Sequence, residues 1–120
     1  MVRALAFIER GRVRLMSRTE RDITVTYPEL APLGPASAHK QLLLDGEIVV
    51  FGDDGWPAFE ALQPRMHVAH ASQAALLAGQ TPVTYLIFDV LQVDGRPLVD
   101  LPYADRRALL DELALAGPYW

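Results

Sequence analysis

Hydrophobic and polar residues alternate in two runs at the start of the chain, residues 2–9 and 12–16. Alternation with a period of two places successive side chains on opposite faces of a β-strand. Arg10 and Gly11 separate the runs, and glycine readily adopts the backbone angles of a tight turn. The pattern therefore predicts a β-hairpin.

The most apolar run, residues 42–51, carries two acids, Asp45 and Glu47, in its middle. A strand here would place both acids on one face and leave the other face fully apolar. Burying unpaired carboxylates costs on the order of several kcal/mol. Two interpretations follow: an edge strand with both acids in water, or a strand whose acids face a ligand pocket. Gly46 between them weakens a strand and indicates that another group approaches the backbone closely.

Residues 83–91 predict a second apolar strand. Strict alternation would place Tyr85 and Asp89 on one of its faces and Phe88 on the other. Asp94 and Gly95 then predict a tight turn into a hairpin-like ending.

Spacings of three and four residues predict helices in the rest of the chain. The expected helices are residues 59–66, 67–77 and 103–116, with a short one beginning near Pro28 and a short strand at 23–26. Hairpins with separated helices indicate an α+β fold, with a mainly antiparallel sheet and flanking helices. No linker divides residues 1–120, so we expect one domain.

The composition describes a globular chain: 120 residues, 51% hydrophobic and 22% charged. There is no cysteine, which excludes disulfides and thiolate metal sites. The apolar runs are too short to span a bilayer, and the N-terminal residues lack a signal-peptide pattern. We therefore expect no membrane association and a cytoplasmic location.

The net charge of −4 is unevenly distributed. Residues 1–27 hold six arginines and three acids, a net charge of +3, whereas the remainder holds five basic and twelve acidic residues, a net charge of −7. Arginine presents a planar fork of donors that suits phosphate. The arginine-rich segment is therefore either a phosphate-binding surface or a solvated hairpin, and charge alone favours the hairpin.

Two other groups of residues raise the question of a metal site. Asp53 and Asp54 lie between glycines, where acids usually form turns. His67 and His70 would share one face of a helix, yet no third ligand has an obvious place beside them.

Five segments, taken in order, resemble motifs of the adenylation domain of ATP-dependent DNA ligases, most closely the ligase module of bacterial ligase D. The segments are Val-Arg-Ala-Leu-Ala at 2–6, Ser-Arg at 17–18 with Arg-Asp-Ile-Thr at 21–24, Leu-Asp-Gly-Glu-Ile-Val at 44–49, Tyr-Leu-Ile-Phe-Asp-Val-Leu at 85–91, and residues 101–110. The resemblance covers nearly the whole chain. It implies about half of an ATP-grasp-like ligase adenylation domain.

The resemblance also implies a role for four residues. Arg3 would be the closing arginine of the nucleophile motif, and Arg18 would contact the nucleotide ribose or a DNA phosphate. Glu47 would bind the ribose or a divalent metal, and Phe88 would stack on adenine. The implied cofactors are ATP and Mg²⁺ or Mn²⁺. An aromatic platform, an acid and guanidinium groups are what a nucleotide-transfer site needs.

The chain departs from the family at the nucleophile. Met1 stands where the motif has glycine, the attacking lysine would precede it, and the single lysine of the chain, Lys40, lies in no motif. The later lysine-containing motifs and the OB-fold domain are absent as well. We therefore assign no catalytic residue and expect that this chain alone neither self-adenylates nor ligates, whether it is a fragment, a degenerate homologue or one part of an assembly.

The resemblance extends to partners. It implies nicked or broken duplex DNA as substrate, and double-strand break repair and recombination by non-homologous end joining in the bacterial nucleoid, with Ku and a polymerase module. We also expect self-association through an exposed apolar sheet edge. The alternatives are a non-catalytic nucleotide- or protein-binding module, and an RNA ligase or capping-type nucleotidyltransferase.

Overall fold

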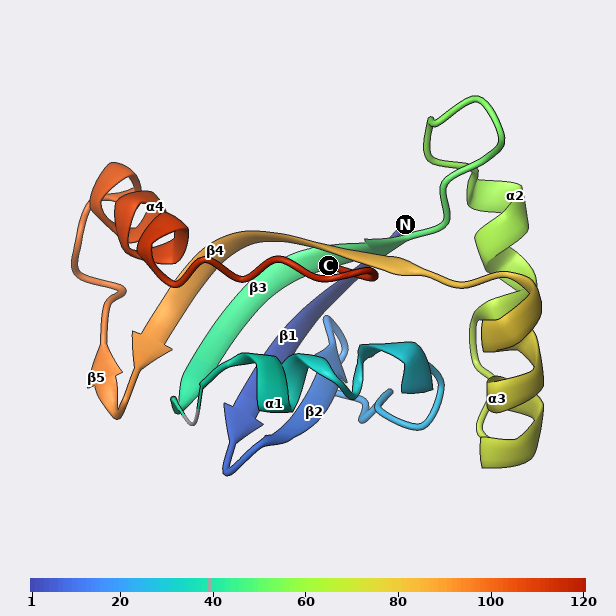
Figure 1. The fold of residues 1–120 in the computed structure, drawn as a ribbon, viewed down its shortest axis with the longest axis horizontal. Helices are drawn as coiled ribbons and strands as arrows, with labels where there is room; N and C mark the ends of the chain where they lie inside the picture. Colours follow the sequence, from blue (N-terminus) through green and yellow to red (C-terminus); the bar gives the residue numbers. More distant parts are fainter. Residues whose placement is uncertain (39) are drawn as a thin grey trace.

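The computed structural model describes residues 1–38 and 40–120 and is built on one antiparallel sheet (Figure 1). The sheet has five strands in the order β2-β1-β3-β4-β5, and every neighbouring pair is antiparallel. The strands are β1 Val2–Glu9, β2 Arg12–Ser17, β3 Leu42–Val49, β4 Thr84–Val93 and β5 Arg96–Pro97. The predicted α+β class, the hairpin and the two apolar strands are confirmed.

Helices flank the sheet at both ends, with α2 and α3 stacked at one end and α4 beside β4 at the other (Figure 1). The helices are η1 Pro28–Leu30, α1 Leu33–Ala36, α2 Phe59–Leu62, η2 Gln63–Arg65, α3 Ala71–Gln80 and α4 Tyr103–Glu112. The C-terminal residues return to β4, where the Tyr85 amide donates to the Tyr119 carbonyl at 2.7 Å. Within the described ranges, no helix is both long and apolar enough to cross a bilayer.

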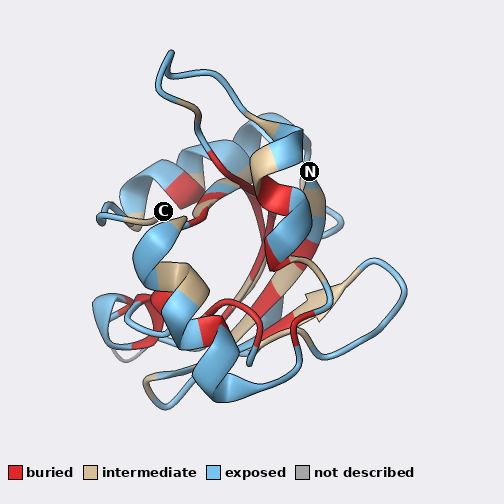
Figure 2. Ribbon diagram, turned by 90° about the vertical axis from the view of Figure 1, so that its right-hand side faces the viewer, coloured by how far each residue is buried: buried red, intermediate tan, exposed pale blue. Residues whose placement is uncertain are grey.

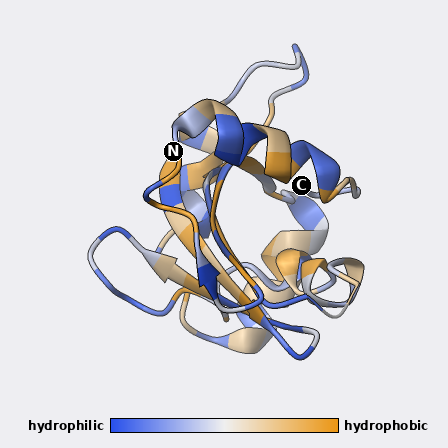
Figure 3. Cartoon of the chain, turned by 90° about the vertical axis from the view of Figure 1, so that its left-hand side faces the viewer, coloured by the Kyte–Doolittle hydropathy of each residue, from blue (hydrophilic) through white to orange (hydrophobic). Residues whose placement is uncertain are grey.

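The core lies against one face of the sheet. Leu44 and Ile48 of β3 are fully buried there, as the alternation predicts. Leu30 and Leu33, which are also fully buried, bring η1 and α1 into the same core. The buried residues follow the strands while the helices expose most of their surface (Figure 2), and the apolar residues are concentrated along the same strands (Figure 3).

A β-bulge in β4 corrects the predicted faces of that strand. Asp45 pairs with Asp89 whereas the next residue, Gly46, pairs with Ile87, so Phe88 is the extra residue. An inserted residue reverses the facing of the residues that follow it, here Asp89 and Val90, as far as a second register shift at Leu91. Asp89 therefore lies on the face opposite Tyr85, and the prediction that they share a face is wrong.

The helix predicted for residues 67–77 begins at Ala71 instead. His67 has a φ of +65°, which no α-helix contains, and His70 has extended backbone angles at the N-cap. The two histidines therefore do not share a helical face, and the geometry expected for a two-histidine metal site is not formed.

Two other boundaries also differ from the predictions. The helix predicted for 103–116 ends at Glu112, and Ala114 has a φ of +50°. The segment 23–26 is not a strand; the Ile23 amide donates to the Leu15 carbonyl at 2.9 Å, and the segment then turns away. The segment covers part of the outer edge of β2, and so protects backbone groups that would otherwise be unpaired at the edge of the sheet.

The Tyr85 hydroxyl connects three strands, because it donates to the Ala4 carbonyl at 2.7 Å and lies 3.4 Å from the Leu44 carbonyl. Burial raises the pKa of Tyr85, and the pKa of Tyr27 is raised for the same reason. We expect Tyr85→Phe to lower the free energy of unfolding by about 1–2 kcal/mol at neutral pH, because a buried hydrogen bond is lost.

Alkaline pH tests the same side chain. Above about pH 10, Tyr85 and Tyr27 release their phenolic protons in the unfolded chain but retain them in the folded chain, so stability falls as pH rises, by up to about 1.4 kcal/mol per pH unit for each of these two tyrosines. Tyr85→Phe removes one of these contributions. Urea unfolding of the wild type and of Tyr85→Phe, at neutral pH and at about pH 11, measures the Tyr85 contribution. If the free energy of unfolding falls equally in both proteins between the two pH values, the contribution assigned to Tyr85 is contradicted.

Candidate functional site

The face of the sheet opposite the core carries the candidate site. The β1–β3 register places Arg3 directly opposite Glu47. The Arg3 guanidinium lies 5.2 Å from the centre of the Phe88 ring, which comes from β4. Three of the four predicted site residues, from three adjacent strands, therefore meet on one face.

Arg3 is held in place by Asp45. Its Nη2 donates to Oδ2 at 2.7 Å and its Nε donates to Oδ1 at 3.3 Å, a two-point ion pair. These hydrogen bonds and the nearby negative charge raise the pKa of Arg3. The arginine thus compensates the buried Asp45 carboxylate, which is neither of the two interpretations that the strand alone allowed.

Glu47 differs from Asp45. Its half-buried side chain has no hydrogen bond or ion pair with any side chain of the described residues. It is the carboxylate on this face that is free to bind a ligand, consistent with the ligand-pocket interpretation for this residue.

The bulge that orients Phe88 is fixed from α4. The Tyr103 hydroxyl donates to the Phe88 carbonyl at 2.9 Å. Arg106 donates to both carboxylate oxygens of Asp89, at 2.9 and 3.2 Å, and these bonds raise the pKa of the Arg106 guanidinium. Asp45 and Asp89 are direct neighbours on the adjacent strands β3 and β4, so their like charges would repel. Arg3 neutralises the first and Arg106 the second.

The roles of Asp89, Arg106 and Tyr103 were missed in the sequence. Asp89 interrupts an apolar strand as Asp45 does, which is the one signal that could have indicated a buried partner. Its partner Arg106 lies 17 residues further along the chain, on another element, and no local pattern identifies it.

The fourth predicted residue, Arg18, lies in the exposed turn that follows β2. No contact joins it to Arg3, Glu47 or Phe88 among the contacts of the described residues. The structure therefore does not bring it into the same cluster.

Metal-binding candidates are sparse in the parts of the chain that the structure describes. No group of three histidine or acidic side chains there is arranged to hold an ion. The Asp54 carboxylate accepts a hydrogen bond from the Trp56 amide at 3.0 Å, which is the turn-forming role that the glycine-flanked acids suggest. Any metal on Glu47 would need its other ligands from phosphate or water.

Comparisons with known proteins identify the family of the chain. The sequence profile of the ATP dependent DNA ligase domain family matches residues 2–118. A probable DNA ligase of Koribacter versatilis is 39% identical over 116 residues, which are 97% of this chain and 20% of that protein. The multifunctional non-homologous end joining DNA repair protein LigD of Mycobacterium tuberculosis is 40% identical over 114 residues, 95% of this chain and 13% of that protein.

A solved structure of mycobacterial DNA ligase D, complexed with ATP and MES, superimposes with a TM-score of 0.79 at 39% identity. The alignment covers 94% of this chain and 34% of that one, so the present chain spans about a third or less of these relatives. By profile, by relatives and by fold, this chain belongs to the ATP-dependent DNA ligase domain family.

Proposed function

We propose that this chain supplies the nucleotide-binding face of an ATP-dependent DNA ligase adenylation domain, acting in nick or end sealing. Phe88 stacks on the adenine ring, and Glu47 binds the ribose or, with phosphate and water, a Mg²⁺ or Mn²⁺ ion. Arg3, held by Asp45, presents its remaining donors to phosphate. Arg18, in the exposed turn that follows β2, contacts a DNA phosphate.

One observation carries this proposal: Arg3, Glu47 and Phe88 converge on the face that the core does not cover. A strand arrangement built only for packing would have no need of an unpaired carboxylate opposite an arginine that also lies against an aromatic ring. The similar mycobacterial ligase D structure is complexed with ATP, which supports the same ligand here.

The absence of a suitably placed nucleophile limits the chemistry. Lys40 is exposed and precedes β3, whose span from Leu42 to Glu47 is about 16 Å at the usual strand rise. We therefore propose that the chain binds nucleotide without forming a lysine–AMP bond, and that another segment or chain supplies the amine.

The relatives' end-joining role supports further partners. We propose broken duplex DNA as substrate, Ku and a polymerase module as partners, and a bacterial cytoplasmic, nucleoid-associated location. Self-association is proposed from the exposed apolar side chains Phe51, Trp56, Phe59 and Leu86, because the largest of them, Trp56, is 73% exposed.

Calorimetric titration with ATP and Mg²⁺ tests the nucleotide site. We expect binding by the wild type and at least a tenfold loss in Glu47→Ala/Phe88→Ala, since stacking is worth about 1–3 kcal/mol per base and the ribose or metal contact adds to it. Each lost 1.4 kcal/mol is a factor of about ten in the dissociation constant.

The matched control is Leu76→Ala, an exposed truncation on α3 outside the Arg3, Glu47 and Phe88 cluster, which should bind ATP as the wild type does. No ATP binding by the folded wild type, or equal loss in the control, would refute the assignment.

A further inference from the structure

Most arginines of the N-terminal hairpin and the turn after it lack acidic partners. Arg3, Arg65, Arg106 and Arg107 each form an ion pair with a carboxylate. Apart from Arg96 on β5, the exposed arginines that form none within 4.0 Å in the described ranges all lie between residues 10 and 21: Arg10, Arg12, Arg14, Arg18 and Arg21. Their charge is therefore available to an external anion.

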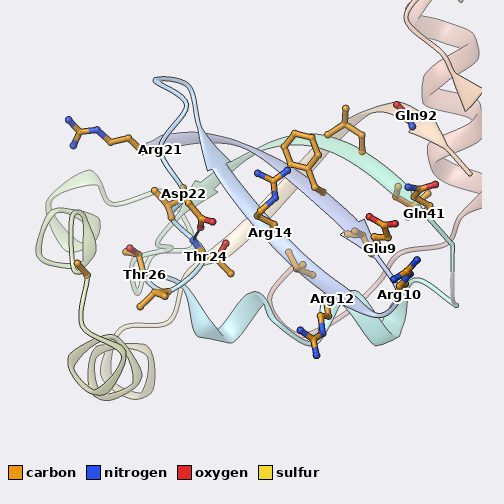
Figure 4. Close-up of a pocket in the computed structure, with 18 of the residues that line it drawn as sticks. Glu9, Arg10, Arg12, Arg14, Arg21, Asp22, Thr24, Thr26, Gln41 and Gln92 are labelled. Atoms are coloured by element: carbon orange, nitrogen blue, oxygen red, sulfur yellow. Dashed lines mark hydrogen bonds between the residues drawn. The ribbon is translucent and has the colours of Figure 1, made fainter. Parts of the chain in front are cut away.

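Among these five arginines, Arg14 is distinguished by stacking on an aromatic ring. Its guanidinium lies 4.4 Å from the centre of the Phe7 ring, which the β1–β2 register places directly opposite (Figure 4). Stacking on a ring orients the guanidinium and leaves its edge N–H groups free. No hydrogen bond from the Arg14 side chain occurs among the described contacts, so these donors face solvent.

An open cleft of about 1450 Å³ runs along this hairpin and is lined by Arg10, Arg12, Arg14 and Arg21 (Figure 4). The cleft is lined by fewer acids than arginines, and one of the acids already accepts a hydrogen bond. Hydrogen bonding from the Thr24 side chain and from its amide, which lies 2.9 Å from Asp22, lowers the pKa of Asp22, and Glu9 is the other acid. The cleft therefore keeps a positive balance in a chain of net charge −4.

The cleft and the candidate nucleotide site share β1, with Phe7 lining the cleft and Arg3 in the site. Arg3 and Phe7 lie on the same face of β1, four residues apart, or about 13 Å at the usual strand rise. One strand of B-DNA carries a phosphate every 3.4 Å or so along the helix axis. A DNA strand that reaches Arg3 would place a phosphate about four nucleotides away beside Arg14.

We propose that Arg14 stacked on Phe7, together with Arg12 two residues earlier on β2, forms a second phosphate-binding site that takes the sugar–phosphate backbone of a DNA strand leading away from the nucleotide site. The proposal rests on the proposed function, because it assigns to the same face the position of its nucleic-acid substrate. The contacts are to phosphate, so the site orients the strand without reading its sequence.

The test is fluorescence anisotropy of a labelled nicked duplex with wild type and with Arg12→Gln/Arg14→Gln, across about 50–200 mM salt. Losing two phosphate contacts should reduce the slope of log affinity against log salt by about 2 and weaken binding several-fold at the low-salt end. The matched control is Arg96→Gln/Arg107→Gln, which removes the same charge from exposed positions on β5 and α4. Circular dichroism melts verify that all variants fold.

An unchanged slope in Arg12→Gln/Arg14→Gln, or an equal change in the control, would overturn the site. Phe7→Leu keeps the charge and removes the platform, so it should weaken binding without altering the slope; no weakening would overturn the stacking role. Equal binding of polyglutamate would show simple charge attraction and would also overturn it.

Calorimetry with ATP separates the two proposals. Arg12→Gln/Arg14→Gln should bind ATP as the wild type does. DNA binding that depends on Arg14 in a protein that does not bind ATP would leave the phosphate site standing and refute the nucleotide site. ATP binding by the wild type, together with an unchanged salt slope of DNA binding in Arg12→Gln/Arg14→Gln, would leave the nucleotide site standing and refute the phosphate site.

Discussion

Arg65→Ala is expected to reduce the free energy of unfolding by about 3–5 kcal/mol, because it leaves a buried carboxylate without its partner. Arg65 is 0% exposed, and its guanidinium binds both oxygens of Glu29, at 2.5 and 2.9 Å. It also donates to the carbonyls of Thr26 and Thr81, at 2.9 and 2.8 Å. The Glu29 oxygen Oε2 additionally accepts from the Val83 amide at 2.9 Å. One side chain thus connects η1, η2 and the segment entering β4.

Urea unfolding followed by circular dichroism measures the loss. For a domain of ordinary stability, roughly 5–15 kcal/mol, the change removes a large part of the total. Arg107→Ala is the control, since that arginine pairs at 3.3 Å with Asp111 on the exposed side of α4 and should cost less than about 1 kcal/mol.

A double variant separates the charge from the packing. Glu29→Leu/Arg65→Met should cost less than the sum of the two single substitutions, because neither charge remains buried alone. Simple additivity, or a loss in Arg65→Ala no larger than in the surface control, would contradict the assigned role.

Gly46→Ala is expected to destabilise the fold by about 3 kcal/mol, through overpacking against backbone. A Cβ atom at Gly46 would collide with the Leu86 carbonyl oxygen and would lie 2.8 Å from the Tyr85 ring. Neither neighbour can withdraw: the carbonyl belongs to the β3–β4 ladder, and the Tyr85 hydroxyl is bound to Ala4. The sequence predicted a close approach at this glycine, and the approaching group is a core tyrosine on the face opposite the candidate site.

Gly79→Ala is a control of opposite sign. Gly79 lies in α3, and a Cβ atom added there would meet no neighbour within 4 Å, so alanine should stabilise the protein by roughly 0.5–1 kcal/mol. Thermal unfolding of both variants gives the comparison. A Gly46→Ala protein with wild-type stability would mean that the strands can separate to admit a methyl group.

Much of the candidate site could be predicted because its signals are local. Asp45 and Glu47 in an apolar run already indicated either solvent or a ligand around the acids; the structure instead pairs Asp45 with Arg3 and leaves Glu47 without a side-chain partner. Arg3 and Phe88 could be selected only through the motifs around them, since an arginine near a terminus and a phenylalanine in a strand are otherwise common features of proteins.

The sequence by itself determined the N-terminal hairpin, the strands β3 and β4, the apolar face of β3 and the family resemblance, because alternation and motif order are read along the chain without knowledge of contacts. Only the tertiary structure decided which acid is paired, where β4 bulges and how Glu29 meets Arg65, 36 residues away. Such pairings depend on which strands and helices become neighbours. The bulge at Phe88 shows the consequence: one inserted residue turns Asp89 toward Arg106 on the site face, although local alternation predicts the opposite.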